Sequence, residues 1–251
     1  RAQLRPLRAT VPVMRELALA MRELCPRALL LNYVNPMATV CWSLADTGIE
    51  CVGLCHGVQT TIRLIAGYLE LPVADIDYVC AGINHMAWFT RLEHQGHSLY
   101  PALRDLFDKP EYYANEKVRG EVFRQFGYFM TESTGHLSEY LPYFRKNSLG
   151  MATYCDEPNF GGETAACLKW SRILAKKYDG ADMLKDEPID LPARSVEYGS
   201  YIIEAVACRR NFCFNGNVMN RGLISNLPAD CCVEVPVFAD GSGLHPTAVG
   251  E

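Results

Sequence analysis

Two short apolar runs, each preceded by a helical segment, constrain the fold of this chain more than any other feature. Residues 11–25 carry apolar side chains at three- and four-residue steps, as an amphipathic helix does: Met14, Leu17, Met21 and Leu24. The apolar run 28–31 follows this helix, a second helical segment begins at Ala38, and the apolar run 51–55 comes next. Helix, strand, helix, strand is the order of a doubly wound sheet, in which parallel strands are buried on both faces. The sequence therefore predicts part of an α/β sheet, with a further helix over 59–71.

The pattern changes after about residue 71, where we place the boundary between a segment 1–71 and a segment 72–251. Two extended stretches, 76–82 and 86–92, are separated by the tight passage Gly82-Ile83-Asn84-His85. The other elements that the pattern predicts are helices at 117–130, 163–178 and 196–209 and strands at 212–219 and 233–238.

Composition excludes several classes of function. The net charge is -5, and Lys and Arg are mixed with Asp and Glu along the chain, so we expect neither a nucleic-acid groove nor binding to an anionic membrane. No apolar run is long enough to cross a bilayer. The eleven cysteines include no C-x-x-C pair, and no signal peptide precedes them. Most of them are therefore interpreted as small buried side chains in a reducing cytoplasm.

Polar side chains stand where the early strands end, and ligands of such sheets bind at the carboxyl ends of strands. Asn35 precedes Pro36 after the first strand, Cys55 and His56 follow the second, and His85 lies in the tight passage. A thiolate and an imidazole are good ligands for a transition metal and leave coordination positions open for a substrate. Taken by spacing alone, a buried cysteine and a hydrogen-bonded histidine are the more common interpretation, and an Asn-Pro pair is often only a turn.

Two later tracts carry groups that could do chemistry. Residues 131–144 include Glu132, His136, Tyr140 and Tyr143, which suit acid–base catalysis but also suit an ordinary surface helix. Residues 217–228 hold three asparagines and an arginine, which could bind sugar hydroxyls or form a run of turns. Spacing does not decide between these alternatives.

Five segments in this order resemble glycoside hydrolase family 4. They read LLNYVNPM at 30–37, VGLCHGVQ at 52–59, AGINHMAWF at 81–89, YGSY at 198–201 and NLPAD at 226–230. The Cys-His pair and the NHMAWF stretch resemble the α-galactosidase branch most. Branches that act on 6-phosphorylated sugars usually have Asp after the metal-binding cysteine.

The resemblance implies a fold similar to lactate and malate dehydrogenases. The expected fold class is α/β: a partial Rossmann-like doubly wound sheet, followed by a lactate/malate dehydrogenase-like C-terminal α+β domain. It also implies hydrolysis of α-galactosides with tightly bound NAD and a divalent metal, usually manganese. In this chemistry C3 of the sugar is oxidised, the acidified C2 proton is removed, the aglycone is eliminated, water adds and the hydride returns.

The same resemblance implies roles for individual residues. Cys55 and His85 would bind the metal, His56 would be the general acid, and Tyr140 would be the base, with Tyr143 as second choice. Asn35 would contact both the sugar and the nicotinamide cofactor. The remaining candidates for sugar binding are Asn84, Asn220 and Arg221.

One departure from the family is that no Gly-rich turn for the NAD pyrophosphate follows an early strand. We therefore expect a chain truncated at its N-terminus, and shortened at its carboxyl end as well, which binds NAD poorly and turns over little by itself. The family's habit predicts a cytoplasmic homodimer or homotetramer. The alternatives are an α-glucosidase or α-galacturonidase of the same family, a lactate/malate-type dehydrogenase, and an inactive sugar- or nucleotide-binding fragment.

Overall fold

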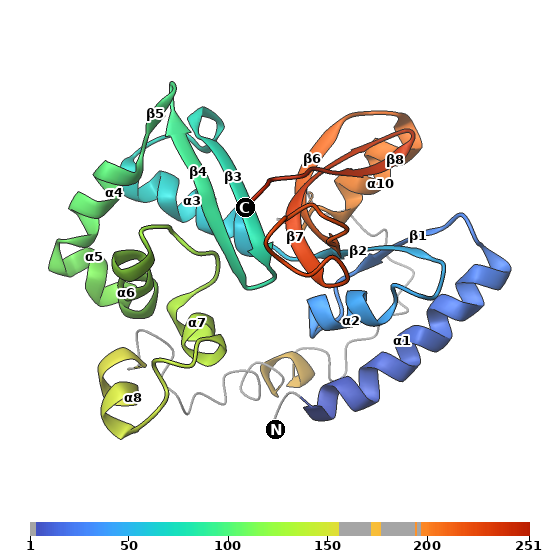
Figure 1. Ribbon diagram of the computed structural model, residues 1–251, viewed down its shortest axis with the longest axis horizontal. Helices are drawn as coiled ribbons and strands as arrows, with labels where there is room; N and C mark the ends of the chain where they lie inside the picture. The colour runs from blue at the N-terminus through green and yellow to red at the C-terminus, as the bar shows by residue number, and fades with distance from the viewer. Residues whose placement is uncertain (1–3, 156–171, 177–193, 195–196) are drawn as a thin grey trace.

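The computed structural model describes residues 4–155, 172–176, 194 and 197–251, and its first elements follow the predicted order (Figure 1). These elements are α1 (Leu4–Leu24), β1 (Leu29–Asn32), α2 (Met37–Ser43), β2 (Glu50–Leu54) and α3 (Gly57–Leu69). Strands β1 and β2 pair in parallel, with Leu30 opposite Cys51. The helix–strand–helix–strand prediction is confirmed.

The later elements include several that the pattern did not predict. The 3₁₀ turn η1 (Val73–Asp75), the strands β3 (Asp77–Ile83), β4 (Met86–His94) and β5 (His97–Ser98), and the helices α4 (Tyr100–Phe107), α5 (Pro110–Asn115), α6 (Lys117–Phe126), α7 (Thr134–Tyr140) and α8 (Ser148–Tyr154) come first. Helix α10 (Gly199–Cys208) and the strands β6 (Phe212–Met219), β7 (Cys232–Asp240) and β8 (Gly243–Pro246) follow. The sequence missed η1, β5, α4, α5, α7, α8 and β8, and the helix predicted at 117–130 ends at Phe126. The helix predicted at 163–178 lies outside the described residues, apart from the helical stretch 172–176.

One eight-stranded sheet contains all of these strands, in the order β1-β2-β6-β7-β3-β4-β5, with β8 paired to β7. Among the described pairs only β1 and β2 are parallel. Strand β6 lies beside β2, with Leu54 opposite Gly216, so the carboxyl-terminal strands complete the sheet that the first strands begin. The sheet thus continues across the proposed boundary at residues 71/72, and that boundary stays a prediction.

Helices cover both faces of the half formed by β1, β2, β6 and β7, as a doubly wound sheet requires. On one face, Met14 and Ala18 of α1 pack against Val40 and Leu44 of α2. On the other face, α10 packs on β2, β6 and β7. The apolar stripe predicted for α1 is only partly used, because two of its members, Leu17 and Leu24, are exposed.

The other half of the molecule is built on the β3–β4 hairpin. Helices α3, α4 and α6 pack against it through a cluster of buried aromatic rings, which are Phe89, Phe107, Phe123 and Phe129. In Figure 1 this half lies to the left of β7, and α7 and α8 lie below it. The hairpin is therefore packed against these helices.

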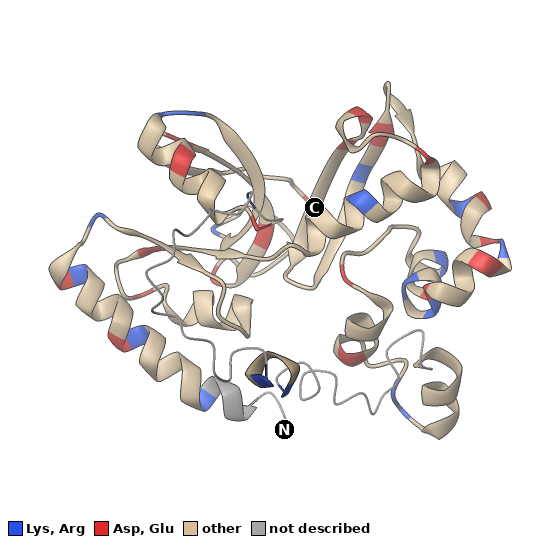
Figure 2. Ribbon diagram, turned by 180° about the vertical axis from the view of Figure 1, so that it is seen from behind, with Lys and Arg blue, Asp and Glu red and all other residues tan. Residues whose placement is uncertain are grey.

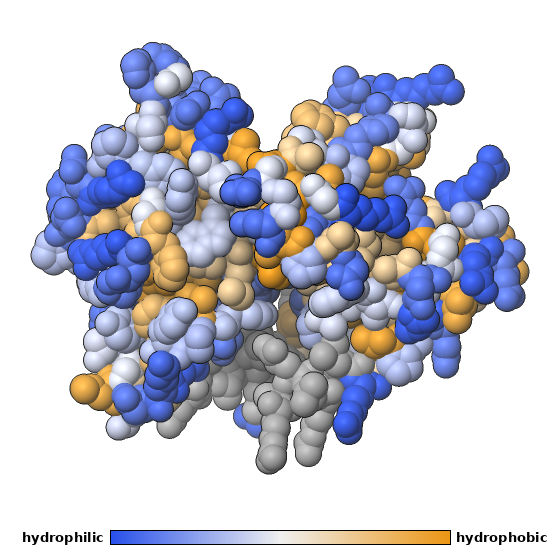
Figure 3. All heavy atoms as spheres, viewed as in Figure 1, coloured by the Kyte–Doolittle hydropathy of each residue, from blue (hydrophilic) through white to orange (hydrophobic). Residues whose placement is uncertain are grey.

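The surface carries charges of both signs. Figure 2 shows Lys and Arg alternating with Asp and Glu along α1 and around α4–α6, and Figure 3 shows polar and apolar side chains mixed over one face. No helix in the described part of the chain is long and apolar enough to cross a membrane. The cysteines in this part are all free. Burial was expected for most of them, and half are buried: Cys41, Cys80, Cys155, Cys231 and Cys232.

Candidate active site

The carboxyl end of β2 presents Cys55, and a buried tyrosine fixes its backbone. The backbone N–H of Cys55 donates to the Tyr198 hydroxyl at 3.1 Å. That hydroxyl lies 2.9 Å from the carbonyl oxygens of both Cys55 and Asn215, to which it can donate. Tyr198, the first residue of the Tyr198-Gly199-Ser200-Tyr201 motif, therefore fixes the end of β2 that carries the Cys55 thiol.

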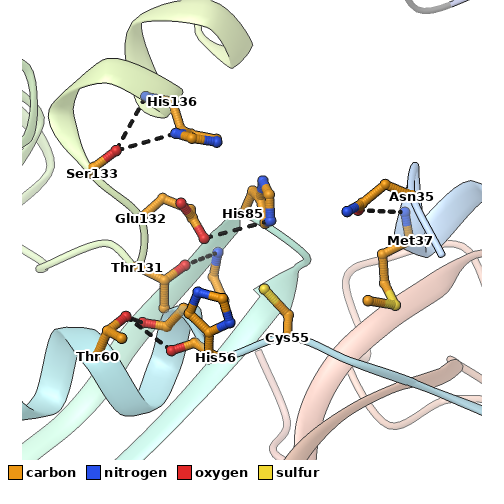
Figure 4. Close-up of polar contacts among 12 residues, drawn as sticks. Asn35, Met37, Cys55, His56, Thr60, His85, Thr131, Glu132, Ser133 and His136 are labelled. Atoms are coloured by element: carbon orange, nitrogen blue, oxygen red, sulfur yellow. Dashed lines mark hydrogen bonds and ion pairs between the residues drawn. The ribbon is translucent and has the colours of Figure 1, made fainter. Parts of the chain in front are cut away.

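The turn between β3 and β4 presents His85 toward the same place. His85 has a left-handed backbone with φ of 66°, which lets the chain reverse between the paired residues Ile83 and Met86. The imidazole is mostly buried and points toward Cys55 (Figure 4).

A third segment brings Glu132 to this turn. The chain over 129–131 lies beside β4: the backbone N–H of Phe89 donates to Phe129, and that of Thr131 donates to Ala87, both at 2.9 Å. Glu132 follows directly, and its Oε1 lies 3.5 Å from Nε2 of His85. Its side chain is only 13% exposed, so the carboxylate is aimed into the protein and not into solvent.

Cys55, His85 and Glu132 form a set of possible metal ligands whose donor atoms all lie within 4.8 Å of one another. A thiolate, an imidazole and a carboxylate suit a divalent transition metal, and three protein ligands leave positions open for substrate oxygens. The donor set therefore fits the metal that the resemblance implies.

Burial controls the protonation of these ligands in the absence of a cation. Burial, and next the charge of Glu234, raise the pKa of the Cys55 thiol to about 11. Burial lowers the pKa of His85, against the opposing charge of Glu132. Burial thus favours the neutral imidazole, which is the form that binds metals, whereas the thiol must lose a proton when a metal binds.

Two further candidates border the cluster. The ring of Tyr140 meets that of His85 edge-on, with centroids 5.4 Å apart, whereas Tyr143 contacts Phe144. Burial, followed by the charge of Glu132, raises the pKa of Tyr140. His56 is half exposed beside the cluster, and its Nδ1 lies 3.1 Å from Oε1 of Glu197.

The asparagine candidates lie on two sides of Cys55. Figure 4 shows Asn35 across from His85, on the loop that leads into α2. The Oδ1 of Asn35 accepts the backbone N–H of Met37 at 3.3 Å, which leaves its amide NH₂ free to face the site. Asn84 is turned inward, where its amide opposes the rise in the pKa of both Cys55 and Glu234.

Comparison with known proteins assigns the chain to a family. Residues 80–251 match the family model described as the family 4 glycosyl hydrolase C-terminal domain, and residues 3–71 match the family 4 glycosyl hydrolase model. The chain belongs to glycosyl hydrolase family 4.

Relatives in this family cover nearly the whole chain. An α-galactosidase of Bacillus subtilis is 38% identical over 249 residues, which are 96% of this chain and 56% of that protein. The chain therefore spans little more than half the length of this relative. Among solved structures, lplD of Bacillus subtilis, assigned as a glucosidase, is 26% identical with a TM-score of 0.83 and covers 99% of this chain and 61% of that one.

More distant structures share the fold. A 6-phospho-α-glucosidase from gut microorganisms, solved with NAD and Mn²⁺, is 21% identical with a TM-score of 0.71, over 98% of this chain and 58% of that one. A lactate dehydrogenase of Eimeria maxima is 13% identical with a TM-score of 0.51, over 97% and 61%. The expected α/β class, a partial Rossmann-like sheet followed by a dehydrogenase-like α+β part, is confirmed.

Two of the sugar-binding candidates lie elsewhere in this family 4 fold. Strand β6 runs antiparallel to β2, so the residues after Met219 lie near the start of β2, at the opposite edge of the sheet from Cys55. Asn220 is fully buried there, and its side-chain amide forms hydrogen bonds with the backbone of the loop 224–228. Arg221 lines a cavity at this opposite edge. The structure thus places both residues away from Cys55, and their contact with the sugar stays a prediction.

Two residues of the site, Glu132 and Glu197, had no role assigned from the sequence. Glu132 was one of several polar residues in its tract, and only the pairing of 129–131 with β4 selects it. Glu197 stands directly before the Tyr198 motif, and its proximity to His56 arises from a contact between residues 141 positions apart. No local pattern marks either residue.

Proposed function

We propose that the protein carrying this chain hydrolyses α-galactosides with the help of NAD and a divalent metal, Mn²⁺ in the first instance. The observation that carries this proposal is the cluster of Cys55, His85 and Glu132 at the end of β2. The α-galactosidase relative supports the substrate, and the related structure with NAD and Mn²⁺ supports the cofactors. An α-glucoside or α-galacturonide remains the alternative substrate within the same family.

In the proposed site, Cys55 and His85 hold the metal, and Glu132 is a third ligand that the sequence did not single out. Bound in the site, a divalent metal and NAD would supply Lewis-acid and hydride-acceptor chemistry to the sugar. The carboxylate of Glu132 would offset part of the positive charge of the cation, and the buried walls of the site would keep bulk water away from it.

The residues around the metal divide the proton transfers. Tyr140 is the proposed base for the C2 proton because its ring contacts the metal-binding imidazole, whereas the ring of Tyr143 contacts Phe144. His56, on the exposed side of Cys55, is the proposed general acid for the leaving group, with Glu197 orienting its ring. Asn35 and Asn84 would bind the sugar, and Asn35 also borders the proposed place of the nicotinamide.

The deciding experiment is hydrolysis of p-nitrophenyl α-galactoside by the full-length protein, with and without NAD and Mn²⁺, under reducing conditions. We expect cleavage only when both are present. Cys55→Ser should abolish turnover and weaken Mn²⁺ binding, whereas Cys25→Ser, at the exposed end of α1, should change neither. Cleavage that needs neither addition would refute the mechanism, and cleavage of only a glucoside or galacturonide would correct the substrate.

A second comparison separates the two tyrosines. Tyr140→Phe should lower kcat by a factor of about 10² or more, the usual contribution of a positioned base, while Mn²⁺ affinity is kept. Tyr143→Phe is the matched control, and equal losses in both variants would remove Tyr140 from the proposed role. The homodimer or homotetramer and the cytoplasmic location stay predictions, the first of which sedimentation would measure.

A further inference from the structure

A group of cysteine sulfur atoms lies where α2 packs on β2, and the proposed catalytic chemistry does not use these atoms. Cys41 of α2 is its centre. The Sγ of Cys51, in β2, lies 3.9 Å from the Sγ of Cys41, and Cys232, at the start of β7, hydrogen-bonds to Cys41 as well. Asn32 adds a third contact, with its Nδ2 3.4 Å from the same sulfur. Residues of β1, β2 and β7 thus meet at one thiol of α2, and of these only Cys232 is distant from Cys41 in the sequence.

A glycine makes this close approach possible. Gly53 faces α2 from β2, and a Cβ at this position would lie 2.8 Å from Sγ of Cys41 and 2.6 Å from Sδ of Met37. Because Gly53 has no side chain, α2 can pack closely enough on β2 to bring the two cysteines together. The cluster formed by Met37, Cys41 and Cys232 is buried, and both Cys51 and the proposed metal ligand Cys55 pack against it.

The surroundings of Cys41 favour its thiolate. Hydrogen bonds from Cys232, Cys51 and Asn32, in that order, lower the pKa of Cys41, although burial opposes them. The same contacts raise the pKa of Cys51 and Cys232, which remain protonated donors. A thiolate flanked by a protonated thiol combines a nucleophile with a second sulfur that can resolve an oxidised product.

The pair can also be reached from outside. A cavity of about 360 Å³ is lined by both Cys41 and Cys51, whereas Cys232 does not line it. Its remaining walls are mostly apolar, with Leu44, Ile49 and Val218 among them, and the charged residues Glu50 and Arg221 line it as well. The apolar part of the wall accepts a small uncharged molecule.

We propose that Cys41 and Cys51 form a peroxide-reactive thiol pair, distinct from the metal ligand Cys55, whose substrate is hydrogen peroxide or a small alkyl hydroperoxide. The Cys41 thiolate attacks one peroxide oxygen, the O–O bond breaks, and the products are a sulfenic acid and, after the other oxygen takes up a proton, water or an alcohol. The Cys51 thiol then attacks this sulfur, a disulfide forms and water leaves. Two thiols are oxidised by two electrons in total, and one peroxide is reduced.

The product would join α2 to β2. Helix α2 begins two residues after Asn35, and β2 ends one residue before Cys55, so the bond would connect the two segments that carry these site residues. The pair is independent of the proposed glycosidase activity, because no step of that activity uses either thiol.

The test maps oxidised cysteines by mass spectrometry. The full-length protein is treated with hydrogen peroxide at limiting amounts, its remaining thiols are alkylated, and peptides are identified with and without a reductant. We expect a Cys41–Cys51 cross-link before the exposed Cys25 or Cys208 is modified. A bond from Cys41 to Cys55 or to Cys232, or an unmodified Cys41 after Cys25 and Cys208 have reacted, would overturn the proposal.

Variants assign the two roles. In Cys51→Ser the sulfenic acid of Cys41 should persist and become trapped by dimedone, whereas Cys41→Ser should leave Cys51 reduced. Cys208→Ser is the control and should oxidise as the unaltered protein does. Equal dimedone labelling of Cys41 with and without Cys51 would show that Cys51 does not resolve the intermediate. Because the mapping also decides the question in the unaltered protein, a variant that fails to fold does not prevent the test.

Discussion

At the scale of single residues, the candidate metal site depends on the absence of a side chain at Gly57 as well as on its ligands. Gly57 is the first residue of α3, directly after Cys55 and His56. A Cβ there would lie 2.7 Å from Oε1 of Glu132 and 3.7 Å from Sγ of Cys55. The glycine therefore leaves the space that the carboxylate occupies. Its φ is not in the left-handed region, so an alanine could adopt the same backbone.

This contact predicts that Gly57→Ala will weaken metal binding without unfolding the protein. The added methyl group would push away the flexible end of Glu132 and spoil the ligand geometry, so Mn²⁺ affinity should fall by about tenfold or more. The measurement is calorimetric titration of the metal-free protein with Mn²⁺.

Gly67→Ala is the matched control, because it lies in the same helix and a Cβ there would meet nothing within 4 Å. It should leave the affinity unchanged and stabilise the helix by up to about 1 kcal/mol. Wild-type affinity in Gly57→Ala would contradict the placement of Glu132 among the ligands.

At the scale of elements, strand β7 lies in the middle of the sheet, and this position buries the carboxyl group of Glu234. Glu234 is 1% exposed and pairs across to Asn217 of β6 on one side and Gly82 of β3 on the other. Burial is the main cause that raises its pKa to about 8, and the charge of Glu132 adds to it. The amides of Asn84 and Asn217 oppose the rise.

This raised pKa predicts a stability that falls with increasing pH. The unfolded chain loses the Glu234 proton near pH 4.3, whereas the folded chain keeps it to about pH 8. The stabilisation is therefore fully present below about pH 4.3 and is lost as the pH rises to 8, by at most about 1.4 kcal/mol per pH unit. Urea unfolding of metal-free protein at several pH values should show Glu234→Gln gaining stability relative to the unaltered protein between pH 5 and pH 8. Parallel pH curves would mean that Glu234 titrates normally.

At the scale of the whole molecule, the two parts of the chain share one sheet. Strand β2 lies between β1 and β6, although β6 is more than 150 residues away in the sequence. Val52 and Leu54 of β2 belong to the same buried cluster as Val233 and Val235 of β7. Removing either part would expose the apolar face of the other.

We therefore expect β2 and β6 to unfold together. Amide hydrogen exchange of the 251-residue chain, followed by mass spectrometry at increasing urea, should give the same midpoint for peptides from both strands. Loss of protection in β2 at clearly lower urea than in β6 would instead show that residues 1–71 form an independent unit.

The amino-acid sequence by itself determined the local elements and the identity of several site residues. Apolar periodicity located α1, because a buried helix face repeats at a fixed local step, and short continuous apolar runs located β1 and β2. The motifs around Cys55 and His85 indicated the family and a metal, because ligand chemistry resides in the side chains themselves.

The tertiary structure alone decided which distant residues meet. It placed β6 and β7 in the centre of the sheet, brought Glu132 to His85 through the pairing of 129–131 with β4, and moved Asn220 and Arg221 to the opposite edge. It also brought Cys51 and Cys232 to the sulfur atom of Cys41. These outcomes depend on strand order and register, which are fixed by packing between segments far apart in the chain, and such packing leaves no periodic trace in either segment.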